Sequence, residues 1–409
     1  MDEINGRTRM STPLLGPQPS GLDDVRAAVR AFAGSHALTT MSMIDYLGAL
    51  FDAGLAWINH PVGAGGMGLA RDLQTPLEDA LVEAGGPAID VYRNPIGTGM
   101  GAPTLAAHGT DLQRARLLRP LWTGEEIWCQ LFSEPDAGSD LAGVSTRAIR
   151  DGDGWVVTGQ KVWTSFAHKA RWAMLLARTD VTARKHQGLT YFILDMTSRG
   201  IEVRPLRQAN GQAEFNEVFL TEVRIPDSMR LGDVGQGWAV ARTTLMNERT
   251  SIGGRESRRD DGYIGRVLSL WRERPDLRTP ATHQRLLQAW VDVEAARLTN
   301  ERTRQATATG VPGLEGSGAK VTFAKVNQDV TRLWAQLDPK AAMTYDDWSV
   351  NSGEAQGQRP ATYHYLRSRA NSIEGGTTEI LLGLIADRVL GLPKEPNPTA
   401  ELAWQDIPK

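Results

Sequence analysis

The segments SEPDAGSDLAG (Ser133–Gly143) and GQKVWTS (Gly159–Ser165) carry more information about this chain than any other part of its 409 residues. The first is rich in proline, glycine, serine and aspartate, a composition that by itself is typical of a surface loop. Residues 151–154 predict a tight turn between strands, and residues 155–165 predict a strand that returns beside the loop. The two segments together therefore predict a loop and a strand that build one site.

Composition bounds the class of protein. The chain is 41% hydrophobic, which is enough to fill the cores of two or three domains. Its 45 basic and 48 acidic side chains give a net charge of -3, so we expect neither nucleic acid nor an anionic membrane as a partner. Seven scattered histidines show no metal-ligand spacing, and no metal is expected.

Cysteine usage and hydropathy point to a reducing compartment. Cys129 is the only cysteine, so no intrachain disulfide can form, and the cytoplasm is the expected location. No window of about 18 uninterrupted apolar residues occurs, and this argues against a signal peptide and a membrane-spanning helix.

The hydrophobic period changes twice along the chain. Val25, Val29 and Phe32 have helical spacing, short β-branched and aromatic runs follow the first helices, and helical spacing returns after Gly237. The expected parts are a loosely ordered leader (1–20), a helical domain (21–122), an antiparallel β domain (123–234), a second helical domain (235–395) and a tail (396–409).

One glycine pattern is misleading. Gly63, Gly65 and Gly68 satisfy GxGxxG, but no clean strand precedes them, and a proline interrupts the sequence where a phosphate-binding helix should continue. We therefore reject a nicotinamide site there.

The two opening segments, and the helix, sheet, helix order over nearly the whole chain, resemble acyl-CoA dehydrogenases. The resemblance implies an α+β acyl-CoA dehydrogenase fold: an N-terminal α-helical domain, a middle antiparallel β-barrel-like domain and a C-terminal four-helix bundle. It also implies FAD as cofactor, an acyl-CoA thioester as substrate and an electron-transfer flavoprotein as electron acceptor.

A flavin ring needs backbone and hydroxyl donors along its polar edge and a flat aromatic wall, and both are present here. The resemblance assigns cofactor contacts to Phe132, Ser133, Gly138, Ser139, Trp163, Thr164, Ser165, Thr377 and Glu379.

Desaturation of a thioester also needs a carboxylate that removes the α proton. In most of the family it directly precedes Gly-Thr near the C-terminus, but SIEGGTTEIL places Gly375 at that position. Glu374 is one residue away, which turns a side chain by about 100° on a helix, so it could serve as an alternative base only with a local bulge. The Gly375 N–H keeps its expected role as a donor to the thioester oxygen, together with the flavin's ribityl 2′-hydroxyl.

Glu248, in the segment LMNER, is the better candidate for the base, because some family members carry the base at this position. Independently of the resemblance, it falls on one helical stripe, where burial should raise its pKa. That stripe comprises Trp238, Ala241, Leu245, Glu248 and Ile252. The alternative is a glutamate at the edge of the stripe, paired with Arg242 or Arg249. Arg249 matches a supporting arginine near the active site in similar members.

Two family motifs are absent, and this points to a partner. Homotetrameric relatives complete the adenine side of each flavin site with Arg-x-x-Phe-Gly and a Gly-Gly-x-Gly turn. Here Arg274 is followed by Pro-Asp-Leu, and residues 342–360 contain no glycine pair. The chain thus resembles one subunit of the two-gene α2β2 enzymes that actinobacteria use on large CoA thioesters, including steroid side chains; the alternative is that the motif has drifted.

Two other functions stay open from the sequence. The chain could be a non-catalytic structural subunit of such a complex, or an acyl-CoA oxidase that shares the same residues.

Overall fold

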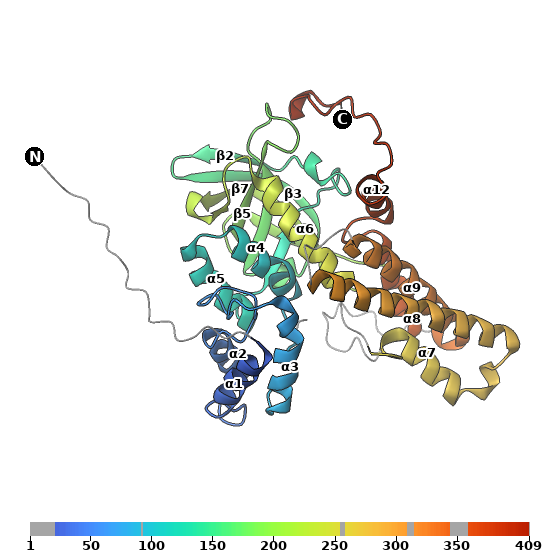
Figure 1. The fold of residues 1–409 in the computed structure, drawn as a ribbon. Coiled ribbons are helices and arrows are strands. Elements are labelled where there is room, and N and C mark those ends of the chain that lie inside the picture. Colours follow the sequence, from blue (N-terminus) through green and yellow to red (C-terminus); the bar gives the residue numbers. More distant parts are fainter. Residues whose placement is uncertain (1–20, 91–92, 254–257, 309–314, 344–358, 409) are drawn as a thin grey trace, which may run out of the picture. The chain divides into compact units, whose positions relative to one another are not determined.

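The computed structural model describes residues 21–90, 93–253, 258–308, 315–343 and 359–408 (Figure 1). The expected leader, residues 1–20, lies outside this part of the chain. The chain divides into two compact units, Met1–Ile89 and Asp90–Lys409, which are described in turn.

The first unit is built from helices α1 (Leu22–Ala33), α2 (Met43–Asp52) and α3 (Gln74–Glu83). Val25, Val29 and Phe32 form the buried stripe of α1, as their spacing predicts, and α1 packs against α3. Within residues 21–90 no strand precedes the GxGxxG segment, whose glycines adopt positive φ angles of 83° at Gly63 and Gly65. The segment is therefore a turn and not the start of a dinucleotide-binding helix.

The second unit contains one mixed sheet in the order β6-β7-β3-β2-β4-β5-β8, with β1 paired to β4. Its strands are β1 (Trp128–Leu131), β2 (Arg147–Asp151), β3 (Gly154–Ser165), β4 (Trp172–Arg178), β5 (Leu189–Asp195), β6 (Ile201–Leu206), β7 (Phe215–Pro226) and β8 (Arg230–Leu231). The expectation of a purely antiparallel domain is wrong at β4, which pairs in parallel with both β1 and β2. β1 runs parallel to β4 because the β2–β3 hairpin lies between them in the chain and returns it to the same edge.

β4 is the most buried strand: all seven of its residues are buried. Such a continuous run is typical of a strand covered on both faces. One face joins the sheet core around Leu175 and Phe192, and helix α6 (Gly237–Gly253) contacts β4 and β5. Cys129 belongs to that core, and burial raises the pKa of its thiol, so it is no reactive cysteine.

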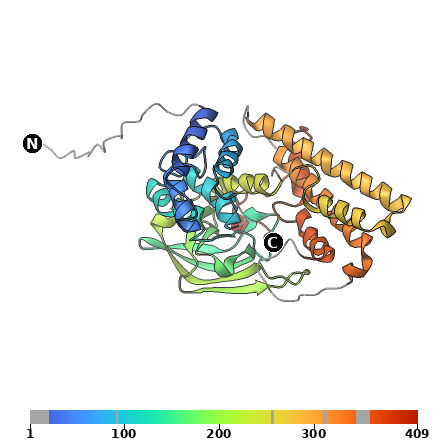
Figure 2. The same ribbon diagram turned by 90° about the horizontal axis from the view of Figure 1, so that it is seen from below.

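The remaining helices of this unit precede or follow the strands along the chain. They are α4 (Ala102–His108), α5 (Asp111–Thr123), α7 (Gly262–Glu273), α8 (Pro280–Ala308), α9 (Glu315–Leu337), α10 (Pro339–Ala342), α11 (Ala361–Ser368) and α12 (Thr378–Arg388). α9 packs against α6, α7, α8, α11 and α12, and it is the common neighbour in the C-terminal bundle. α8 and α9 run side by side (Figure 2), while α6 leads from the sheet towards them (Figure 1). None of the helices in the described ranges is long and apolar enough to cross a membrane.

The C-terminal segment returns to the sheet. Trp404 N–H donates to the Ala183 carbonyl at 2.9 Å, and Gln405 N–H donates to the Val181 carbonyl at 3.1 Å. The Trp404 ring covers the guanidinium of Arg178, which lies 4.4 Å from the ring centre. Residues 403–405 therefore form part of the β layer.

Candidate functional site

A buried ion pair joins the loop Ser133–Gly143, called the SEP loop below, to strand β3. Lys161 and Glu134 are 0% and 5% exposed, and the Lys161 ammonium donates to Glu134 Oε1 at 2.8 Å. The same ammonium donates to the carbonyls of Phe132 (2.9 Å) and Leu176 (2.8 Å). The Lys161 ammonium therefore holds the start of the SEP loop, through Phe132 and Glu134, against strand β4, through Leu176.

Donors from the other side of the loop complete the environment of Glu134. Its carboxylate accepts from the backbone N–H groups of Ser145 (2.7 Å) and Thr146 (2.9 Å) and from the Ser145 hydroxyl (2.9 Å). Burial alone would raise the pKa of Glu134, but the Lys161 charge and these donors outweigh it and lower the pKa to about 2. Glu134 is therefore an ionised structural anchor.

Trp163 stands out from the sheet. Its φ is 60°, in the left-handed region, and the pairing of β3 with β7 is irregular between Lys161 and Thr164. This irregularity turns the indole outward, where it is 61% exposed and meets the edge of the Phe215 ring at 6.0 Å between centroids. The exposed indole face is available to pack against a planar ligand.

The other residues expected to contact the flavin ring differ in how exposed they are. Phe132 is buried and meets the Tyr191 ring edge-on at 5.8 Å, whereas Ser133 and Ser165 are half-buried. Thr164 is fully buried, and its hydroxyl has no hydrogen-bond partner among the described residues, so the Thr164 side chain does not face solvent. Gly138 and Ser139 lie on the exposed part of the loop, next to the ion pair of Asp140 with Lys185.

Glu248 lies on α6, one turn after a buried hydroxyl pair. The Tyr191 hydroxyl and Thr244 Oγ1 are 3.0 Å apart, and Thr244 Oγ1 is 3.0 Å from Thr104 Oγ1. Burial raises the pKa of Tyr191, and the Glu248 carboxylate adds to this effect, which places Glu248 within electrostatic reach of the Tyr191 hydroxyl. Glu248 itself is half-buried, and the Arg249 side chain lies outside the described residues.

The turn before α12 has an unusual backbone. Gly375 and Gly376 both have positive φ angles, 65° and 93°, which favour glycine at both positions. Among the described residues, the Gly375 N–H has no hydrogen-bond acceptor. Thr377 is the N-cap of α12, where its hydroxyl accepts from the Ile380 N–H at 3.2 Å, and Glu379 is exposed in the first turn.

Three N–H donors occupy the carboxylate of Glu374. Arg367 donates to both of its oxygens, at 3.2 and 3.0 Å, and Asn371 Nδ2 donates to Oε1 at 2.6 Å. Both oxygens of the Glu374 carboxylate are therefore engaged in charge-assisted or amide hydrogen bonds. Arg367 also lies 3.4 Å from Glu214 and packs on the Phe215 ring, which links this turn to Trp163.

Arg274, the arginine at the expected position of the absent motif, forms ion pairs within the chain. Its guanidinium donates to both oxygens of Asp276, at 2.8 and 2.6 Å, and lies 3.6 Å from Asp338. The expected glycine-turn position, residues 344–358, lies outside the described part of the chain.

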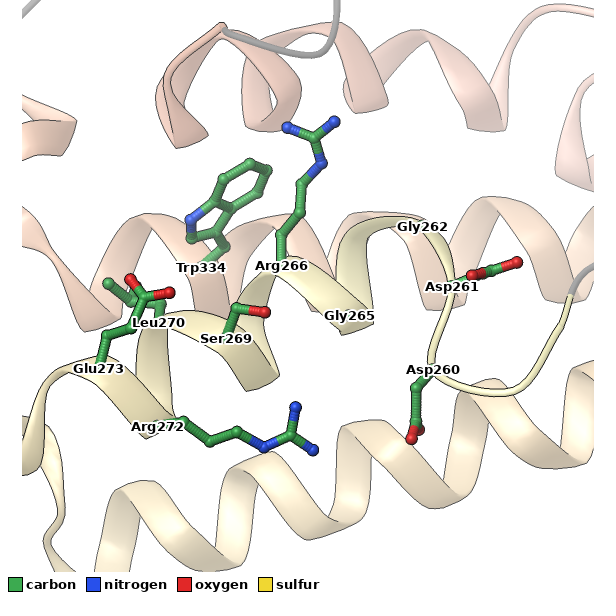
Figure 3. Close-up of a pocket in the computed structure, with 10 residues that line it drawn as sticks. All are labelled: Asp260, Asp261, Gly262, Gly265, Arg266, Ser269, Leu270, Arg272, Glu273 and Trp334. Atoms are coloured by element: carbon green, nitrogen blue, oxygen red, sulfur yellow. The ribbon is translucent and has the colours of Figure 1, made fainter.

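A hollow of about 530 Å³ lies along α7 and contains none of the expected site residues (Figure 3). It is lined by Asp260, Asp261, Gly262, Gly265, Arg266, Ser269, Leu270, Arg272, Glu273 and Trp334. Its walls carry charges of both signs, and we assign it no role.

Comparison with known proteins places these features in a family. Residues 129–223 match the acyl-CoA dehydrogenase middle domain, and residues 235–390 match the acyl-CoA dehydrogenase C-terminal domain. The chain is 35% identical to acyl-CoA dehydrogenase IpdE1 of Mycobacterium tuberculosis, over 84% of this chain and 86% of that protein.

The chain belongs to the acyl-CoA dehydrogenase family.

Two further relatives extend the comparison. Acyl-CoA dehydrogenase FadE34 of Mycobacterium tuberculosis is 40% identical over 78% of this chain, a match that spans only 43% of FadE34. A solved structure named the Tcur3481-Tcur3483 steroid ACAD superposes with a TM-score of 0.70 at 26% identity and covers 93% of this chain and 99% of that one.

Membership of the acyl-CoA dehydrogenase family implies FAD as the cofactor. The residues fit this group: the exposed Trp163 offers an aromatic face, and a side chain added at Gly138 would meet nothing within 4 Å, so the loop is open to a bulky ligand. Ser133, Ser139 and Ser165 supply hydroxyl donors nearby in the same loop and strand. The isoalloxazine would lie against Trp163 and the SEP loop.

Four residues were not found from sequence: Lys161, Tyr191, Arg367 and Lys320, whose ammonium donates to the Gly376 carbonyl at 2.6 Å. The sequence does contain a signal for Lys161. Trp155 and Val157 mark the face of β3 that points into the core, and Lys161, at an even spacing from both, lies on the same face. A lysine on an inward phase requires a buried carboxylate. The other three depend on contacts between elements that are distant in sequence.

The Lys161–Glu134 pair leads to a first prediction. Glu134→Gln leaves a buried ammonium without its counter-ion, and we expect a loss of about 3 kcal/mol in the free energy of unfolding. Glu202→Gln, which removes the charge of an exposed partner of Arg204, is the control and should leave the free energy of unfolding nearly unchanged. Equal losses in urea denaturation would show that the buried pair has no special weight.

The same pair predicts a pH dependence. The pKa of Glu134 is about 2 in the folded chain, below the value of about 4.3 for an unfolded glutamate. The ionised Glu134 therefore contributes its full stabilisation of the fold above about pH 4.3, and this contribution disappears as the pH falls towards 2. Between pH 5 and 3, wild-type stability should fall more steeply than that of Glu134→Gln, by up to about 1.4 kcal/mol per pH unit. Parallel curves from denaturation at each pH would contradict the assignment.

Trp163 gives a third prediction. Trp163→Ala should change unfolding free energy by no more than about 0.5 kcal/mol, since the ring is exposed, yet it should reduce bound FAD per protein. Trp155→Phe, which removes the partly buried 2.7 Å hydrogen bond from the indole to Asp227, should lower stability and keep the FAD. Flavin absorbance and thermal unfolding of both variants decide between a binding wall and a core residue.

Proposed function

We propose that this chain catalyses the FAD-dependent α,β-dehydrogenation of an acyl-CoA thioester, with Glu248 as the base and the Gly375 N–H as a donor to the thioester oxygen. We further propose that it is the base-bearing subunit of an α2β2 complex with a homologous partner. An electron-transfer flavoprotein would accept the electrons.

The observation that carries the choice of base is the contrast between two glutamates. Glu248 is half-buried within electrostatic reach of Tyr191, whose ring meets Phe132 at the start of the SEP loop, whereas Glu374 lies in the turn before α12 and accepts from Arg367 and Asn371. A base must lie within reach of the reacting carbon. The position of Glu248 next to the SEP loop favours it over Glu374.

The chemistry divides between the protein and its cofactor. FAD, when bound, supplies the acceptor for the hydride that leaves the β carbon. Glu248 takes the α proton, and the Gly375 N–H stabilises the negative charge that develops on the thioester oxygen as the proton leaves. Phe132 and Tyr191 bury the neighbourhood of the base and exclude water from it.

Arg274 supports the need for a second subunit. The FAD pyrophosphate requires cations and backbone donors, and the charge of Arg274 is already balanced by Asp276 and Asp338. Two copies of this chain would therefore present a weak adenine-side cradle to each other. The two-component name of the Tcur3481-Tcur3483 steroid ACAD is in keeping with this arrangement and suggests a bulky, steroid-derived thioester as the substrate class.

Glu248→Gln provides the direct test of the base. The amide is nearly isosteric but not basic, so in the co-expressed complex FAD should stay bound while substrate-induced flavin bleaching under anaerobic conditions slows by ~10² to 10⁴. Glu374→Gln is the matched variant and should retain proton removal within about tenfold. The opposite ranking would move the base to Glu374, and wild-type protein that bleaches with no CoA ester, from short-chain to sterol-derived, would favour the structural-subunit alternative.

The subunit proposal has its own test. Expressed alone, the chain should retain FAD poorly; co-expressed with a homologous subunit from a neighbouring gene, it should form an α2β2 assembly with about one FAD per αβ pair. Native mass spectrometry and flavin counting measure both. A homotetramer with four tightly held FAD molecules would contradict the proposal, and faster reoxidation by oxygen than by electron-transfer flavoprotein would indicate an oxidase.

A further inference from the structure

The turn that presents Gly375 is held by two cations from different helices. On one side, the Arg367 guanidinium of α11 binds both oxygens of Glu374. On the other side, the Lys320 ammonium of α9 donates to the Gly376 carbonyl at 2.6 Å. Gly375 lies between these two contacts.

Each cation is itself placed by packed structure. Lys320 is fully buried, so its stem is fixed within the bundle. Arg367 lies over the Phe215 ring, 5.7 Å from its centre, and 3.4 Å from the Glu214 carboxylate. Glu214 is joined to β3, since its backbone carbonyl accepts from the Phe166 N–H at 2.8 Å.

These contacts form one continuous path from the turn to the aromatic wall. Glu374 contacts Arg367, Arg367 contacts Phe215, and Phe215 meets Trp163. Asn371 adds a second attachment, because it donates to Glu374 and accepts from Asn327 of α9 at 2.6 Å. Arg367 contacts both the turn, through Glu374, and the β layer, through Glu214 and Phe215. It therefore fixes the distance between the turn and the β layer.

We propose that Arg367 and Lys320 are positioning residues, which hold the Gly375 N–H at the place where the thioester oxygen is bound. The inference rests on the proposed role of Gly375. A donor to an oxyanion acts only within about 2.7–3.1 Å of its final position, and an error of about 1 Å can cost ~10²-fold in rate. A turn made of two glycines has little stiffness of its own, so external contacts must supply it.

Removing Arg367 would also create a repulsion. Glu214 and Glu374 both lie within 3.4 Å of the same guanidinium, and without it two carboxylates would face each other across the gap. The turn should move away from the β layer, and the Gly375 N–H should move with it.

The test uses the co-expressed complex, in the Glu248→Gln background so that the thioester is not consumed. Octanoyl-CoA labelled with ¹³C at the thioester carbonyl is the probe, and difference infrared spectroscopy measures how far binding lowers the carbonyl stretch. Adding Arg367→Met should abolish at least half of that lowering, and Arg367→Lys should restore part of it.

Arg369→Met is the matched control, because Arg369 contacts Gln328 and Tyr365 but neither Glu214 nor Glu374. It should leave the carbonyl shift unchanged at comparable thermal stability. With Glu248 restored, Arg367→Met should lower kcat by ~10²-fold.

Two outcomes overturn different statements. If the Glu248→Gln complex with Arg367 intact gives no carbonyl shift, the proposed role of Gly375 fails. If that complex gives the shift and Arg367→Met retains all of it, Gly375 keeps its role and the positioning inference is wrong.

Discussion

The buried contact between Lys161 and Glu134 is the constraint on which the site depends. An ammonium removed from water costs several kcal/mol unless it is fully paired, and here one carboxylate oxygen and two backbone carbonyls satisfy it. Because those carbonyls belong to Phe132 and Leu176, the requirement ties three segments of the chain together. The SEP loop cannot shift along β3 without exposing a charge to the sheet core.

From this fixed point the site extends in two directions. Val162 N–H donates to the Ser133 carbonyl at 2.9 Å, so the loop and the strand that presents Trp163 keep one register. Tyr191 extends the other side, because its ring meets Phe132 and its hydroxyl lies beside Thr244, one turn before Glu248. The sheet thus supplies a rigid surface, and α6 and the Gly375 turn bring the chemical groups to it.

Local sequence was sufficient for the parts of the structure that obey a simple period. The α1 stripe and the β3 strand with its turn at residues 151–154 follow from spacing and turn rules. The parallel pairing of β1 with β4 does not follow from local sequence, since the four residues of β1 carry no information about the direction of a strand that lies far away in the chain. Likewise, SIEGGTTEIL shows that a carboxylate is displaced from its usual position, but only the Arg367 contact explains how Glu374 is occupied.

The return of the C-terminal segment to the sheet has a consequence for how the β layer is completed. Arg178 lies in the central strand β4, yet the ring that covers its guanidinium is Trp404, which follows the whole helical bundle in the chain. A contact between such distant residues forms late, because the intervening chain must first be ordered. During synthesis on the ribosome, the sheet would therefore leave this face uncovered until residues 403–405 emerge, and Arg178 would lack its aromatic cover until then.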